Sequence, residues 1–236
     1  MLLLHETHRV TGVHEGAFAD AFREGWMPAL AAGDDARLLF FGHQAHGTGR
    51  AYVVVTVTGV RDGSAWERLA RRVECGDLRP WAERVDGYRH DVHGKILMPV
   101  DWSPGLVEDW TAVPVDGREH PPGLFMEDTA WPHEGMLSRY LEAARDHYAP
   151  SLTEGRHGGR ALLELQAVLR PAWGTGRRRE VILWQKVVDP SRLTALLGSE
   201  IPAVHRAPGT WMHDALAVRD DWESRLLRSA SWSPLA

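Results

Sequence analysis

The four residues Gly47–Arg50, GTGR in one-letter code, follow the apolar run RLLFFGHQ and precede AYVVVTVTGV. The same four letters return at Gly174–Arg177, after ALLELQAVL and before the run REVILWQKVV. Two runs rich in β-branched and apolar residues, joined by a short glycine-containing segment, are typical of a β-hairpin. Each GTGR is therefore predicted to be a hairpin turn. A phosphate-binding loop is the alternative, but it needs a helix directly after the glycines, where the sequence predicts a strand.

Other short matches between the two parts of the chain keep the same order as the turns. They are HEG at His14 and His133, WMPAL at Trp26 and YAPSL at Tyr148, HD at His90 and His213, and DW at Asp101 and Asp221. Ordered matches at a nearly constant offset indicate an internal repeat. We predict two copies of one unit, residues 1–115 and 123–236, joined by a linker at 116–122 within a segment rich in proline and glycine.

Each copy has the same predicted elements in the same order. The first copy predicts strands at 2–10, 37–44, 51–60 and 95–100, with helices at 16–32 and 64–73. The second predicts strands at 124–131, 161–169, 179–188 and 214–218, with helices at 135–152 and 191–198. This order is β-α-β-β-α-β, the ferredoxin-like unit. The predicted fold class is α+β, with two fused ferredoxin-like repeats whose sheets face each other as a barrel, within one chain or with a second one.

Composition narrows the class of partner. The 236 residues are 44% hydrophobic and 25% charged, and the formal net charge of −5 argues against a nucleic-acid partner. No run of about 18 apolar residues predicts a membrane span. The single cysteine, Cys75, fits a reducing cytoplasm. We therefore expect a cytoplasmic protein that binds a small molecule and that can form a homodimer.

Three stretches resemble the NIPSNAP-like group of the dimeric α+β barrel superfamily. They are LHETHRVTGVHEGAFADAFREGWMPAL from Leu4, ILMPVDWSPG from Ile96, and WSPL from Trp232. The resemblance covers most of both copies and implies the barrel fold. It implies no single reaction, because the superfamily contains cofactor-free monooxygenases, cyclases and haem enzymes. Function must therefore be argued from the site.

Strand alternation selects the candidate site residues. In the first strand of the first copy, one face carries Leu4, Glu6 and His8. In the first strand of the second copy, the corresponding face carries Phe125, Glu127, Thr129 and Trp131. We expect these faces to line the barrel, because the helices should cover the opposite faces. A carboxylate in such an aromatic cavity can act as an acid or base near neutral pH. The predicted catalytic residues are Glu6, Glu127 and His8. The predicted substrate-binding residues are Trp184, Glu164, Gln166, Trp131 and Phe40.

Three H-x-x-H pairs raise the possibility of a metal site. They begin at His5, His43 and His90. A spacing of three places two side chains on opposite faces of a strand, so His5 and His8 should not bind one ion together. His90 and His93 are expected in a loop before the closing strand. We expect no metal and no cofactor, and a metal- or haem-dependent enzyme of the same fold is the alternative.

The resemblance to this superfamily, and not any motif, implies a small-molecule enzyme of bacterial secondary metabolism. It would act on an organic substrate in an aromatic cavity, with acid–base assistance from a glutamate or histidine and without a cofactor, as a cyclase, isomerase or monooxygenase does. A non-catalytic ligand-binding or interaction protein is the other alternative.

Overall fold

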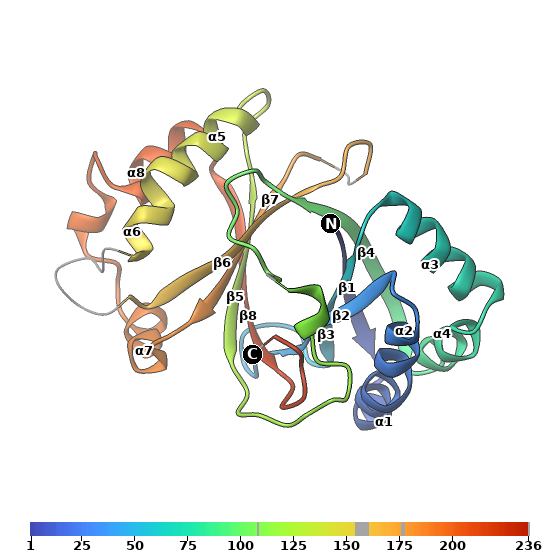
Figure 1. The fold of residues 1–236 in the computed structure, drawn as a ribbon. Coiled ribbons are helices and arrows are strands. Elements are labelled where there is room, and N and C mark those ends of the chain that lie inside the picture. The colour runs from blue at the N-terminus through green and yellow to red at the C-terminus, as the bar shows by residue number, and fades with distance from the viewer. Residues whose placement is uncertain (108, 154–160, 176–177, 236) are drawn as a thin grey trace.

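The computed structural model describes residues 1–107, 109–153, 161–175 and 178–235 (Figure 1). Eight antiparallel strands form a closed barrel in the order β1-β3-β2-β8-β5-β7-β6-β4. The strands are β1 Leu2–Val10, β2 Ala36–Gln44, β3 Val53–Val60, β4 Arg89–Pro99, β5 Leu124–Trp131, β6 Leu163–Pro171, β7 Val181–Val187 and β8 Asp221–Ser229.

The barrel consists of two four-stranded units with the same strand order. The first unit reads β4-β1-β3-β2 and the second reads β8-β5-β7-β6. The units join at two short seams. In one seam β2 pairs with β8 from Gly42 to Gln44, and in the other β4 pairs with β6 from Leu97 to Pro99. A single chain therefore closes the barrel, and the predicted fold class is confirmed.

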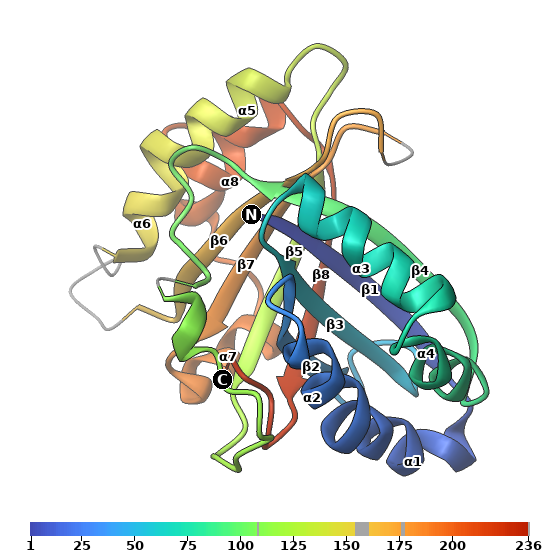
Figure 2. The same cartoon turned by 45° about the vertical axis from the view of Figure 1, so that its right-hand side comes forward.

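Helices cover the outer face of each unit (Figures 1 and 2). The first unit carries η1 Gly12–His14, α1 Glu15–Asp20, the π-helical turn η2 Ala21–Trp26, α2 Met27–Ala32, α3 Gly63–Cys75 and α4 Arg79–Asp86. The second carries α5 Leu137–Ala143, the π-helical turn η4 Ala144–Tyr148, α6 Ala149–Thr153, α7 Pro190–Gly198, η6 Ala203–Arg206, α8 Trp211–Asp214 and η7 Ala215–Ala217. Between the units lies η3 Trp110–Ala112.

The first helical segment follows its apolar pattern. Phe18, Phe22, Trp26 and Leu30 recur at spacings of four. Phe18, Phe22 and Leu30 are buried against the sheet, and Trp26 is partly buried. Each unit has a π-helical turn in the middle of its first helical segment, and such turns occur frequently at functional sites. Gly25 lies in η2, where an added Cβ would overlap the Trp81 ring of α4. The absence of a side chain at Gly25 therefore lets α4 lie close to the first helix.

Apolar side chains fill the centre of the barrel. Phe40 packs against Phe125 and Trp184 with ring centroids 5.1 and 4.9 Å away. All three rings are buried, as is Leu227 beside them. Val113 from the segment between the units also packs there. The centre is therefore a packed core.

The two GTGR segments are followed by strands, as the hairpin prediction requires. Gly47 and Gly174 have φ values of 80° and 81°, a left-handed conformation that favours glycine. Thr48 and Thr175 each donate a side-chain hydrogen bond to the carbonyl three residues earlier, at 2.6 and 2.7 Å. Gly176 and Arg177, the end of the second GTGR, lie outside the described residues.

Some predicted boundaries are wrong. Residues 214–218, expected as the closing strand of the second copy, belong mainly to α8 and η7, and the strand is β8 at 221–229. β4 begins at Arg89, so His90 and His93 lie in a strand and not in a loop. The helix α4 was not predicted. The preceding helix α3 ends at Cys75, and the three residues Gly76–Leu78 that separate it from α4 did not indicate that a second helix begins there.

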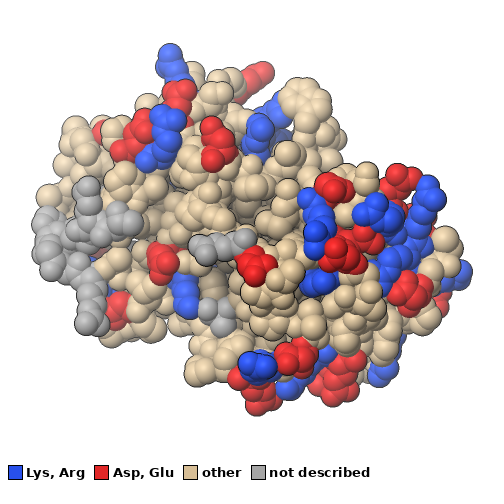
Figure 3. Space-filling model, in the orientation of Figure 1, with Lys and Arg blue, Asp and Glu red and all other residues tan. Residues whose placement is uncertain are grey.

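No helix among the described residues is long and apolar enough to cross a membrane. On the face shown in Figure 3, Lys and Arg alternate with Asp and Glu over the helices of the first unit. That face therefore presents both signs of charge.

Candidate functional site

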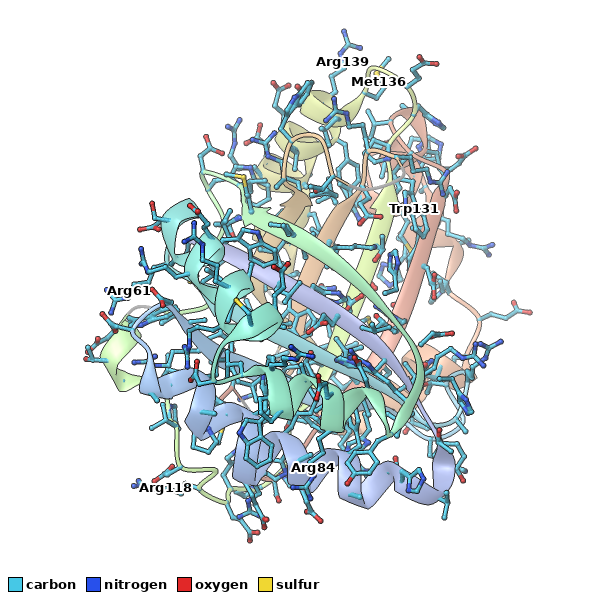
Figure 4. All side chains as sticks on the ribbon, turned by 90° about the vertical axis from the view of Figure 1, so that its right-hand side faces the viewer. Arg61, Arg84, Arg118, Trp131, Met136 and Arg139 are labelled. Atoms are coloured by element: carbon cyan, nitrogen blue, oxygen red, sulfur yellow. The ribbon has the colours of Figure 1, made fainter. Side chains whose placement is uncertain are left out.

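A cleft of about 310 Å³ lies between the sheet of the first unit and the helices that cover it. Its floor is formed by Leu4 and Glu6 of β1, Thr58 of β3 and Arg89 at the start of β4. Figure 4 looks onto α3 and α4, which cover this cleft, with Arg84 of α4 on their outer side. The volume is at the lower end of the range for small-molecule sites, which suits a ligand of one or two rings.

The walls of the cleft are aromatic and aliphatic. Phe22 and Trp26 come from the π-helical turn η2, and Trp66 comes from α3. Aliphatic side chains add to the wall: Leu69, Ala70 and Val73 of α3, and Ala82 and Val85 of α4. The acidic residues Glu74 of α3 and Asp86 of α4 also line the cleft. Flat aromatic walls with few polar groups are the usual lining of a pocket for a planar organic ligand.

The Glu6 carboxyl group is the acid on the floor of the cleft. Among the described residues, it accepts no hydrogen bond and forms no ion pair. Burial raises its pKa above the ordinary value, while the Arg89 guanidinium opposes that rise. Glu6 therefore exchanges protons at a higher pH than an exposed glutamate does, and its oxygens are available to a ligand.

Arg89 is the cation of the cleft, and two neighbours fix its position. Its Nη1 donates to Nδ1 of His8 at 2.6 Å, and its Nε donates to Asp86 at 2.9 Å. Because a guanidinium only donates, His8 carries its proton on Nε2, which donates to the Thr56 hydroxyl at 2.9 Å. Burial and the adjacent Arg89 hold the pKa of His8 well below its ordinary value. A neutral His8 thus orients Arg89 from behind.

The corresponding space in the second unit is filled by polar side chains. Asp128 occupies in β5 the helix-facing position that Glu6 occupies in β1. It accepts hydrogen bonds from Ser224 and from Gln185, and Tyr148 donates to Gln185. Burial raises the pKa of Asp128, but its oxygens are already bound. Of the two helix-facing acids, only Glu6 faces a cleft without a hydrogen-bond partner among the described residues.

Glu6 and Glu127 do not share a face, contrary to the sequence-based expectation. Glu127 points into the barrel, where it accepts from Nε2 of His5 at 2.8 Å and from Arg225. His5, and not Glu6, is the residue of β1 that matches Glu127. Leu4, Glu6 and His8 face the helices, and His8 packs against Phe18 at 5.2 Å between ring centroids. The expectation failed because Glu6 was matched to Glu127 as the same residue type. In the structure Glu6 corresponds to Asp128, one position further along β5.

The predicted substrate-binding residues are dispersed. Trp184 and Phe40 point inward, as the alternation predicts, and they pack against each other in the core of the barrel. Glu164 is exposed, and Gln166 occupies a bulge in β6 that turns Ala167 and Leu169 inward. These two therefore do not line a cavity with Trp184.

Trp131 lies at the last position of β5, opposite Asp221 at the start of β8 (Figure 4). Its indole N–H donates to Glu180 at 3.2 Å. Glu6 faces the helices and Trp184 faces the barrel interior, so these two predicted residues do not line one cavity. Glu6 and His8 are the predicted residues that lie at the cleft or directly behind it.

Sequence reasoning missed Arg89 and the aromatic walls. The spacing of Phe22 and Trp26 on one helical face placed them in the core but could not reveal that Trp26 borders a cleft. Arg89 gave no signal, because its strand was predicted to begin six residues later. Among the described residues, no group of three or more His, Cys, Asp or Glu side chains is placed to hold a metal ion.

No family model matches the sequence, and no curated protein matches it. A candidate monooxygenase from Lactobacillus acidophilus is similar in structure over 98% of this chain and 96% of its own, with a TM-score of 0.61 and 8% identity. An anthrone oxidase-like protein is similar over 97% and 91%, with a TM-score of 0.57 and 11% identity. A NIPSNAP domain protein from Burkholderia xenovorans covers 44% of this chain and 99% of its own, with a TM-score of 0.38 and 20% identity. These similarities show the fold alone, an α+β barrel of eight antiparallel strands.

Proposed function

We propose that the protein is a cofactor-independent enzyme that moves a proton on a small, planar organic substrate held in the Glu6 cleft. One observation carries the proposal. Glu6 is a carboxyl group with a raised pKa, without a hydrogen-bond partner among the described residues, on the floor of an aromatic cleft. Such a group is suited to general acid–base catalysis near neutral pH.

The proposed step needs only the side chains of the cleft. The Glu6 carboxylate removes a proton from a carbon next to a carbonyl group of the substrate. The electron pair of the broken C–H bond moves onto the carbonyl oxygen, giving an enolate, and Glu6 returns the proton to the same or a conjugated carbon. No electron leaves or enters, so the step requires no oxidant.

Arg89 has the complementary role in this proposal. Its guanidinium is held by His8 and Asp86 and faces the same cleft as Glu6. A fixed cation stabilises the negative charge that develops on the enolate oxygen, and it does so without reorganising in the transition state. Phe22, Trp26 and Trp66 would hold the rings of the substrate and exclude water from the reacting carbon.

The experiment uses 2-tetralone, a two-ring ketone, in D₂O, with NMR detection of the loss of its α-proton signals. We expect the wild-type protein to accelerate the exchange above the buffer rate. Glu6→Gln keeps the shape of the side chain and should reduce the acceleration by about 100-fold or more, the usual contribution of a general base. The matched control is Glu164→Gln, an exposed glutamate outside the cleft, which should exchange like the wild type.

The proposal fails if Glu6→Gln and wild type exchange the ketone equally fast, or if the wild type gives the buffer rate with 2-tetralone and with its smaller analogue cyclohexanone. We also propose that the protein is related to the NIPSNAP-like group, that its two units arose by duplication, and that it has a role in biosynthesis. The identical strand order of the two units supports the duplication.

A further inference from the structure

A second hollow, of about 610 Å³, lies beside the β6–β7 hairpin and away from the Glu6 cleft. Arg170 of β6, Trp173, and Arg178 and Arg179 before β7 line one side. Met98 of β4, Pro171 and Leu137 of α5 contribute apolar surface. The hollow thus combines guanidinium groups with an apolar lining.

The charges of this hollow do not cancel. Arg178 forms an ion pair with Asp221 and lies 4.4 Å from the centroid of the Trp131 ring. Glu180, the one acid of the lining, is bound by Lys95 at 2.7 Å. Among the described residues, no carboxylate forms an ion pair with Arg170 or Arg179. Two guanidinium groups are therefore left to attract an anion.

The aromatic group at the rim is unusually exposed. Trp173 is 83% exposed, and the Arg179 guanidinium lies 4.6 Å from its ring centroid. A large aromatic side chain in water gains little for the fold, whereas its flat face can stack on a planar ligand. The Arg179 guanidinium lies over one face of that ring, which leaves the opposite face to a ligand.

The hairpin turn itself does not require Trp173, Arg178 or Arg179. The first GTGR turn has the same glycine conformation and the same threonine hydrogen bond. Aligning the two turns places His46 opposite Trp173, Ala51 opposite Arg178 and Tyr52 opposite Arg179. The tryptophan and the arginines are thus features of the second hairpin alone.

We propose that this hollow binds a small planar organic anion. Its carboxylate or phosphate group would lie between Arg170 and Arg179, and its ring would stack on Trp173. This inference is independent of the reaction proposed for the Glu6 cleft.

The test is isothermal titration calorimetry of the full chain with 2-naphthoate and with the uncharged 2-naphthamide. We expect one saturable site for naphthoate and at least about 10-fold weaker binding of the amide, because charge-assisted hydrogen bonds supply much of the affinity. The double variant Arg170→Gln/Arg179→Gln and the variant Trp173→Ala should each bind naphthoate about 10-fold more weakly. Arg50→Gln, which removes one charge from the first turn, is the matched control and should bind like the wild type.

Three results would overturn the inference: no saturable naphthoate binding to the wild type at millimolar ligand, equal affinity for acid and amide, or undiminished binding to the double variant. Loss of binding in Glu6→Gln would place the ligand in the other cleft and would overturn it as well. All of these side chains except Glu6 lie at the surface, so melting temperatures of the variants should match the wild type and exclude unfolding as the cause.

Discussion

The imidazole of His5 and the carboxylate of Glu127 meet inside the barrel at 2.8 Å, although 122 residues separate them in the chain. His5 belongs to the first unit and Glu127 to the second, and both side chains are almost fully buried. Arg225 completes the cluster by binding Glu127 and donating to the Thr7 hydroxyl at 3.2 Å. The cluster therefore joins the two sheets at a point where the rest of the core is apolar.

Glu127→Gln should destabilise the fold by about 3 kcal/mol at pH 7, because it leaves Arg225 without its carboxylate in a largely buried position. Burial alone would raise the pKa of Glu127, but His5 and Arg225 hold that pKa well below the ordinary value. The folded pKa lies below the unfolded one, so this stabilisation is complete above about pH 5.5 and declines as the pH falls below about 4.5. Urea unfolding at pH 7 and pH 3.5 measures both effects. Equal stability of the variant and the wild type at pH 7 would contradict the role of the cluster.

Glu6→Gln should act on stability in the opposite direction. The folded pKa of Glu6 is raised, so ionising it weakens the fold as the pH rises through that pKa. Glutamine removes this cost. At pH 7 to 8 the variant should therefore be more stable than the wild type, by less than about 1 kcal/mol since the side chain is partly exposed. Below pH 4 the difference should vanish. Chemical denaturation across this range gives the comparison, and a less stable variant at pH 8 would count against a partly buried acid without a partner.

His8 should stay neutral with its proton on Nε2. Burial and Arg89 lower its pKa, and Arg89 occupies Nδ1 as a donor. We predict that ¹⁵N NMR of the imidazole shows an unprotonated Nδ1 and no titration of His8 between pH 7.5 and pH 5.5. In Arg89→Gln the Nδ1 resonance should move. A His8 imidazole that takes up a second proton within that pH range would disprove this arrangement.

Trp184→Ala should cost about 3 to 5 kcal/mol of stability, because the ring fills the barrel core and its removal leaves a void. Trp173→Ala is the matched control, since that ring is 83% exposed, and it should change stability by less than about 0.5 kcal/mol. Thermal unfolding distinguishes the two. A small effect at Trp184 would point to an open cavity where the structure has a packed core.

The repeated turns and the apolar runs beside them were enough to predict the β-α-β-β-α-β order, because glycine conformation and strand alternation are local properties. The direction of Glu6 was not a local property. One-residue differences in register reverse the face of a strand, and only the pairing of His5 with Val57 and of Glu127 with Trp184 shows which residues correspond. Likewise, the bulge at Gln166 interrupts the alternation of inward and outward side chains in β6, although the sequence pattern predicts that it continues. The unit boundaries at 115 and 123 stay predictions.

The cleft itself could not be predicted, because it depends on how closely α4 approaches the sheet. That approach depends on Gly25 beneath Trp81, a contact between two segments that the sequence does not relate. The aromatic residues Phe22 and Trp26 were visible as a helical face, but whether such a face is packed or open is decided by the neighbouring helix. Asp128 illustrates the closed case, where Tyr148 and its partner Gln185 occupy the space.

The most direct measurement of the central claim is the pH titration of the Glu6 carboxyl carbon by ¹³C NMR, assigned by its absence in Glu6→Gln. We expect a midpoint clearly above the ordinary glutamate value of about 4.5, shifted further when 2-tetralone is added, because the ligand displaces water from the cleft. A midpoint at or below the ordinary value, unchanged by the ketone, would contradict the assignment of Glu6 as the acid–base group of this protein.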